Sequence, residues 1–128
     1  MHNFKQLNIW IKSMELVKDI YLLTNLLPDR ERFGMISQMQ RAAISVPANI
    51  AEGSAKSSGK DFCRFLEIST GSLFELETFV ILAENLKYID LEKSIIIQQK
   101  INEIQKMIFG FKQKINQNIS QNQQNLKS

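Results

Sequence analysis

The chain of 128 residues has little of several residue types on which particular structures depend. It contains one cysteine, Cys63, so no internal disulfide can form, which is typical of a protein in a reducing cytoplasm. Two prolines and five glycines provide few turns, which argues against a sandwich or barrel of many short strands. No apolar run approaches the ~18 residues of a membrane span, and the first residues carry no signal-peptide pattern. We therefore expect a cytoplasmic protein without a membrane partner.

The residues that catalysis or metal binding would require are also scarce. Metal-binding helical bundles use Glu-x-x-His pairs, but the single histidine, His2, precedes every helical pattern. Cys63 has no internal histidine to activate it as a nucleophile. The small-residue stretch 53–61 lacks both the spacing of a phosphate-binding loop and a preceding strand. We expect no catalytic residue, no metal site and no cofactor, and hence a protein that is not an enzyme.

What the chain does have is apolar residues at steps of three and four. They predict helices over 8–27, over 36–53, from Ser58 to Leu86, and from Asp90 onward, with Ser58 and Asp90 as N-caps. The first helix is expected to have a broad apolar face, with a seam of Trp10, Met14, Val17, Tyr21 and Thr24 flanked by Leu16, Ile20 and Leu23. The seam of the second helix is Ile36, Met39, Ala43, Val46, Ile50 and Gly53, and that of the last is Ile97, Ile101, Ile104, Ile108, Phe111 and Ile115. The third helix carries a seam (Phe62, Leu66, Ser69, Leu73, Leu76, Val80, Ala83) and a second apolar row (Phe65, Ile68, Phe79, Leu82, Leu86). Two rows exceed the needs of one core, so we expect this helix to face a second subunit as well.

Four helices with short links predict one all-α domain over 1–117, an antiparallel up-down-up-down four-helix bundle with a left-handed supercoil. Pro47 lies inside the second helix and is expected to kink it, because proline removes one backbone hydrogen bond. From Asn116 to Ser128, eight of thirteen residues are Asn or Gln. That composition predicts a frayed or disordered tail over 118–128.

A polar stripe follows the second helix opposite its apolar seam. Its members, at steps of three and four, are Gln38, Arg41, Ser45, Asn49 and Glu52. The stripe is either an ordinary solvated face or a buried polar network, since alanines beside it would let another helix approach closely.

Basic residues gather in two places. One group, near the link between the second and third helices, comprises Lys56, Lys60 and Arg64. The other, on the last helix, comprises Lys93, Lys100, Lys106, Lys112 and Lys114. Such groups bind phosphate backbones, but they also keep ordinary helices soluble, and the formal net charge of +3 is modest.

Several segments together resemble a known family. They are the run QMQRAAISVPANIAEG at 38–53, the segments 62–68 and 71–78, the opening 4–10, and the link 27–34. These segments resemble the four-helix-bundle family named after proteins encoded in 23S rRNA intervening sequences, over about residues 4–115. The Asn/Gln-rich tail lies beyond the family pattern.

The resemblance implies a small bacterial cytoplasmic protein without catalytic activity that assembles into a homopentamer. A related branch, the accessory protein of diversity-generating retroelements, is a basic pentamer that associates with reverse transcriptase and nucleic acid. The motif positions carried over are Arg41, Ser45, Pro47, Asn49, Glu52, Gly53, Ser72 and Glu75. Their implied role is structural: Pro47 sets a kink, Gly53 ends the helix, and the polar side chains join the second and third helices or neighbouring protomers.

Our functional expectation is a homopentameric scaffold that binds nucleic acid, structured RNA before DNA, through its lysine-rich surfaces. The alternative is a protein–protein interaction module that does not bind nucleic acid directly. The two differ in whether Lys100, Lys106 and Lys114 point outward after assembly or into the subunit interface.

Overall fold

The computed structural model describes residues 3–127, which form four α-helices and no strand. The helices are α1 (Asn8–Thr24), α2 (Ser37–Ser54), α3 (Gly59–Asn85) and α4 (Leu91–Lys127). Three short helical turns accompany them: η1 (Phe4–Gln6) precedes α1, and η2 (Asp29–Glu31) and η3 (Arg32–Ile36) lie between α1 and α2. The prediction of an all-α protein with four helices is confirmed.

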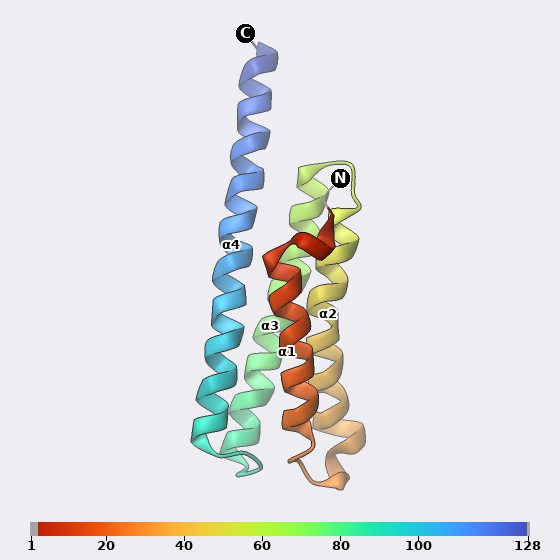
Figure 1. Cartoon of the computed structure of the whole chain (residues 1–128), viewed down its shortest axis with the longest axis vertical. Helices are drawn as coiled ribbons and strands as arrows, with labels where there is room; N and C mark the ends of the chain where they lie inside the picture. The colour runs from red at the N-terminus through yellow and green to blue at the C-terminus, as the bar shows by residue number, and fades with distance from the viewer. Residues whose placement is uncertain (1–2, 128) are drawn as a thin grey trace.

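The helices lie side by side, and successive connections lie at opposite ends of the molecule (Figure 1). The links α1–α2 and α3–α4 are at one end, and the link α2–α3 is at the other. The interface between α2 and α3 is the most extensive, and that between α1 and α4 is much smaller. No helix in the part of the chain that the structure describes is both long and apolar enough to cross a membrane.

The core follows the apolar seams that the sequence predicts for α2, α3 and α4. Every member of the α3 seam is buried, from Phe62 to Ala83. In α4 the isoleucines Ile97, Ile101, Ile104 and Ile108 are buried against it. Burying aliphatic side chains of this size contributes about 1.5–3 kcal/mol each, so these seams are the main source of stability.

The expected seam of α1 is displaced by about one position. Met14 and Tyr21 are exposed, whereas Leu16, Ile20 and the polar Ser13 are buried. The hydroxyl of Ser13 donates a hydrogen bond to the carbonyl oxygen of Ile9 at 2.6 Å. This hydrogen bond, to a carbonyl one turn earlier in the same helix, pairs the hydroxyl. A serine can therefore occupy a core position although the apolar pattern does not include it.

Side-chain caps begin α3 and α4, as predicted. Ser58 Oγ accepts a hydrogen bond from the Asp61 backbone N–H at 3.1 Å. Asp90 Oδ1 accepts one from the Lys93 backbone N–H at 2.8 Å. This backbone bond, together with the Lys93 ammonium, lowers the pKa of the Asp90 carboxyl below its usual value.

The segment 118–128, expected to be frayed or disordered, is helical up to Lys127, and Ser128 lies outside the described residues. The side chains of 120–126 are all exposed, so tertiary packing does not hold this end. A helix that is already nucleated gains one hydrogen bond for each residue added, and neither glycine nor proline interrupts the segment. The amide composition is therefore compatible with a helix that extends into solvent.

Candidate nucleic-acid interface

Five of the eight predicted basic residues line surface hollows where the α2–α3 link meets α4. We call this group the basic cluster: Lys56, Lys60, Arg64, Lys112 and Lys114. The link and the start of α3 supply the first three, and α4 supplies the last two. The first basic group and two lysines of the second, far apart in sequence, therefore meet beside the α2–α3 link.

Two hollows make up this region. The first lies between the link and α4 and contains Lys56, Ser58 and Lys114. The second lies between α3 and α4 and contains Lys60, Arg64 and Lys112. The two share Ile119 of α4, so they lie next to each other.

Close packing of α3 on α4 sets the position of the cluster. A Cβ atom added to Gly59 would lie 2.8 Å from Ile115 Cγ2 and 3.3 Å from Ile119 Cδ1. Only glycine allows the start of α3 to lie this close to α4. Beside it, the rings of Phe62 and Phe111 meet edge to face with centroids 5.4 Å apart.

Most of the positive charge of the cluster is available to a ligand. Lys112 Nζ lies 3.4 Å from Glu67 Oε1, and Arg64 lies 4.0 Å from Asp61, both through exposed carboxylates. Such surface ion pairs contribute at most about 1 kcal/mol and are readily exchanged. The other three cations form no ion pair among the described residues, although Lys56 Nζ lies 5.0 Å from the centre of the Phe65 ring.

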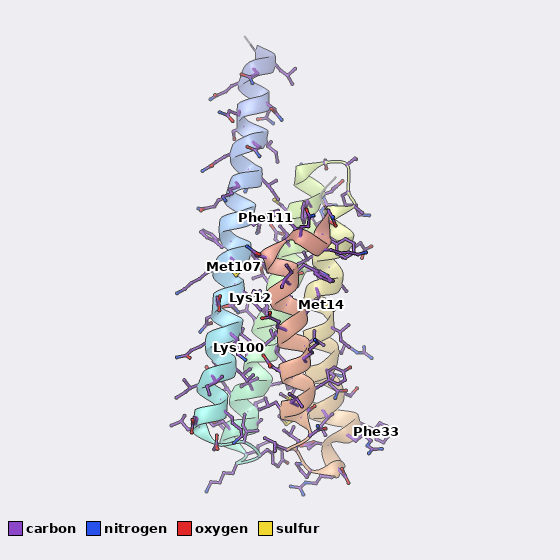
Figure 2. The ribbon with its side chains drawn as sticks, in the orientation of Figure 1. Lys12, Met14, Phe33, Lys100, Met107 and Phe111 are labelled. Atoms are coloured by element: carbon purple, nitrogen blue, oxygen red, sulfur yellow. The ribbon has the colours of Figure 1, made fainter. Side chains whose placement is uncertain are left out.

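The remaining three predicted lysines lie apart from the cluster. Lys93 pairs with Asp90 at 3.0 Å, and Lys100 pairs with Asp19 of α1 at 2.8 Å. Figure 2 shows Lys100 and Lys12 where α1 and α4 run alongside each other. Lys106 is exposed on α4 and lines neither hollow. Lys100 and Lys114 occupy one side of α4, but fourteen residues separate them by about 21 Å along the helix.

The polar motif residues of α2 fall into a packed group and an exposed group. Ser72 Oγ of α3 donates to Ser45 Oγ at 2.8 Å, and Asn49 Nδ2 donates to Ser45 Oγ at 3.0 Å. These three side chains are partly buried and form a small polar network between α2 and α3. Arg41 and Glu52 are exposed, so the stripe is a network in its middle and a solvated face at its ends.

Gly53 is a position of close helix contact. The helix α2 ends at Ser54, one residue after this glycine. A Cβ atom at Gly53 would lie 2.8 Å from Phe65 Cβ and 2.9 Å from Phe62 Cδ1 of α3. Because Gly53 has no side chain, the end of α2 can pack closely against the start of α3, next to the basic cluster. Pro47 is buried inside α2, which continues on both sides of it.

The outer side of α2 and α3 combines apolar and charged residues. We call it the α2–α3 face, and its exposed members are Arg41, Ile44, Glu52, Ile68, Glu75 and Leu82. The Ser45–Ser72 hydrogen bond joins the two helices at its centre. The charged side chains Arg41, Glu52 and Glu75 form no ion pair within the described chain.

The described residues hold no group of three or more His, Cys, Asp or Glu side chains that could bind a metal ion, and His2 lies outside them. Cys63 is buried, and burial raises the pKa of its thiol. Its Sγ lies 3.7 Å from Asn116 Oδ1, to which it donates. A protonated thiol is a poor nucleophile.

Amide side chains that the sequence did not mark as site residues lie beside the basic cluster. Asn118 and Asn122 line the first hollow, and Asn116 and Gln123 line the second. The composition of the tail concealed them. The available signal was the apolar period itself, because Ile115, Ile119 and Leu126 continue the helical spacing past Asn116.

The fold and the surface together define a small four-helix protein with one basic end and one partly apolar helical face. The family model for the 23S rRNA-intervening sequence protein matches residues 5–110, and the chain belongs to this family. The resemblance noted in the sequence is thus confirmed.

A solved structure has the same fold. It is the crystal structure of a protein of unknown function from the S23 ribosomal protein family of Bacteroides thetaiotaomicron. The TM-score is 0.73 at 28% sequence identity, and the match covers 81% of this chain and 97% of that chain. No curated protein matches this chain.

Proposed function

We propose that the protein is a non-enzymatic, cytoplasmic homo-oligomer, a pentamer, that binds structured RNA through the basic cluster. The observation that carries this proposal is the meeting of Lys56, Lys60 and Lys114 around the two hollows, without a carboxylate partner among the described residues. Phosphate groups are the ligands that such a surface attracts most strongly. The family name, which refers to an rRNA, is consistent with RNA as the partner.

Assembly is supported by the α2–α3 face. Ile44, Ile68 and Leu82 are each more than a third exposed on it, next to charged groups that have no partner within the chain. A second subunit would bury the isoleucines and pair the charges. The number five is what the family resemblance implies.

A ring would strengthen weak phosphate contacts. Five protomers of net charge +3 would carry about +15 in total. Several linked weak sites raise the overall affinity by ~10²-fold or more without any new kind of contact. A modest charge per subunit is therefore sufficient for an oligomeric RNA-binding scaffold.

The finer geometry of the bundle belongs to the same proposal. A left-handed supercoil fits the average spacing of 3.5 residues in the apolar seams. A kink at Pro47 fits the loss of the hydrogen bond that its missing N–H would give to the carbonyl of Ala43.

The second candidate is a protein-interaction module that does not bind RNA. It is favoured by a surface groove between α1 and α4, where Leu22, Leu26 and Ile96 are exposed between Asp19 and Lys100. Such a groove suits an amphipathic helix of a partner protein.

Binding of the purified protein to a labelled RNA hairpin, titrated from low to physiological salt, tests the first candidate. The triple variant Lys56→Gln, Lys60→Gln, Lys114→Gln is expected to weaken binding at least about tenfold and to flatten its salt dependence, because phosphate contacts are lost. The matched control is Lys18→Gln, Lys87→Gln, Lys106→Gln, which makes the same change in net charge away from the hollows.

The control variant is expected to bind nearly as the wild type does, and the oligomer mass of both variants should be unchanged. Equal losses in the two triple variants would mean that only net charge matters. No binding by the wild type at any salt concentration would favour the protein-interaction module.

A further inference from the structure

The end of α4 projects beyond the rest of the molecule. The last contacts of α3 with α4 are made near Gly59, which lies against Ile115 and Ile119. Beyond Ile119 the helix continues for about 12 Å, and the side chains of 120–126 are exposed (Figure 1). The projecting part of α4 therefore begins next to the basic cluster and continues away from it as a helix.

Amide side chains dominate this end of α4. Eight of the ten residues from 116 to 125 are Asn or Gln. We call 116–125 the amide segment. Four of the eight are Asn, which is uncharged and a poor helix former, so neither charge nor helix propensity accounts for the asparagines.

Only Ile119 and Ser120 of the amide segment lack an amide side chain. The segment continues directly from the basic cluster. Asn118 and Asn122, one turn apart, line the first hollow with Lys56 and Lys114. Gln123 lines the second hollow, which also contains Lys60 and Arg64. A ligand whose phosphates lie on the cations would therefore lie within reach of these amides.

The chemistry of the two groups is complementary. Cations that bind phosphates position a nucleic acid but do not distinguish its bases. Each Asn or Gln amide offers both a donor and an acceptor, and it can form two hydrogen bonds with the edge of an adenine. The major groove of an RNA duplex is too deep and narrow for side chains to read, whereas unpaired bases in loops and bulges expose their edges.

We propose that the amide segment recognises unpaired bases of RNA, adenines above all, next to a duplex whose phosphates lie on the basic cluster. This inference rests on the proposed function and adds to it the feature of the RNA that is bound. It assigns a role to a segment that lies outside the residues matched by the family model.

The test compares two RNA probes, a fully paired duplex and the same duplex interrupted by an internal loop of adenines. The variant is Asn118→Ala, Asn122→Ala, Gln123→Ala; Asn116 is left in place because it accepts a hydrogen bond from Cys63. The matched control is Gln99→Ala, Asn102→Ala, Gln113→Ala, which removes three exposed amides from the same helix outside the hollows. Alanine favours helix at all six positions, so both variants should fold, which circular dichroism checks.

The wild type and the control are expected to bind the looped RNA about tenfold more tightly than the paired duplex. The amide variant should bind both probes equally, with its affinity for the paired duplex unchanged. A wild type without preference for the loop, or an amide variant that keeps the preference, would overturn the inference but leave the proposed function standing. Binding to neither RNA, or tighter binding to a DNA duplex of matched sequence, would overturn both.

Discussion

At the scale of single residues, two glycines in neighbouring helices provide a matched comparison. Gly53→Ala is expected to lower the free energy of unfolding by about 1–2 kcal/mol, because the new Cβ would lie 2.8 Å from Phe65 Cβ. Gly71→Ala in α3 is expected to raise it by up to about 1 kcal/mol, because no atom lies within 4 Å of the new Cβ and alanine favours helix. Urea unfolding followed by circular dichroism measures both. Stabilisation by both substitutions would show that α2 and α3 can separate at Gly53 without cost.

Single residues also show where prediction from the sequence failed. In α1, the apolar pattern assigned Met14 and Tyr21 to the core, but Ser13 is buried instead. Periodicity identifies a helix and its broad apolar side. It does not show which of two adjacent rows of similar hydrophobicity is buried, because that depends on how the other helices pack against them. Likewise, the sequence marks Gly53 as special, but only the approach of Phe62 and Phe65 reveals the reason.

At the scale of elements, the regular seams of α3 and α4 could be predicted because large aliphatic residues there are separated by clearly polar ones. The caps Ser58 and Asp90 could be predicted as well, because each side chain accepts a hydrogen bond from a backbone N–H only three residues later in the sequence. The end of α4 could not. A polar composition indicates that a segment is not buried, but it does not show where a helix ends. The helix can continue into a polar segment because the packed turns before it have already nucleated it.

The end of α4 gives a prediction about stability. Deletion of 120–128 is expected to change the free energy of unfolding by less than about 0.5 kcal/mol, because the side chains of 120–126 are exposed. Deletion of 115–128 is expected to lower it by about 2–4 kcal/mol, because the buried Ile115 and the partly buried Ile119 are lost. Thermal and urea unfolding of the two shortened chains measure the difference. A large loss from the shorter deletion would mean that the projecting end docks on another surface, such as a second subunit.

At the scale of the whole molecule, the candidate site depends on meetings between distant segments. Each basic group could be found in the sequence. The sequence could not show that only Lys112 and Lys114 of the α4 group join the basic cluster. Lys100 and Lys114 occupy one side of α4, yet the first pairs with Asp19 of α1 and the second lies beside the α2–α3 link. Helical spacing gives the side of a helix on which a residue lies. The residues that surround it in the fold depend on where along that helix the other helices begin and end.

Assembly can be tested with two isoleucines that are almost equally exposed. Ile68 on the α2–α3 face is 47% exposed and Ile95 on α4 is 43% exposed, so an aspartate at either position would remain solvated in a single chain. Ile68→Asp is expected to weaken assembly by about a hundredfold or more while the helices persist, because a subunit packed on the α2–α3 face would bury an unpaired charge. Ile95→Asp should leave the oligomer mass unchanged. Native mass spectrometry over a range of protein concentrations, with circular dichroism in the same buffer, separates dissociation from unfolding. If only Ile95→Asp dissociates the oligomer, the subunits meet through α4, and the second apolar row of α3 must be covered by something other than another copy of this chain.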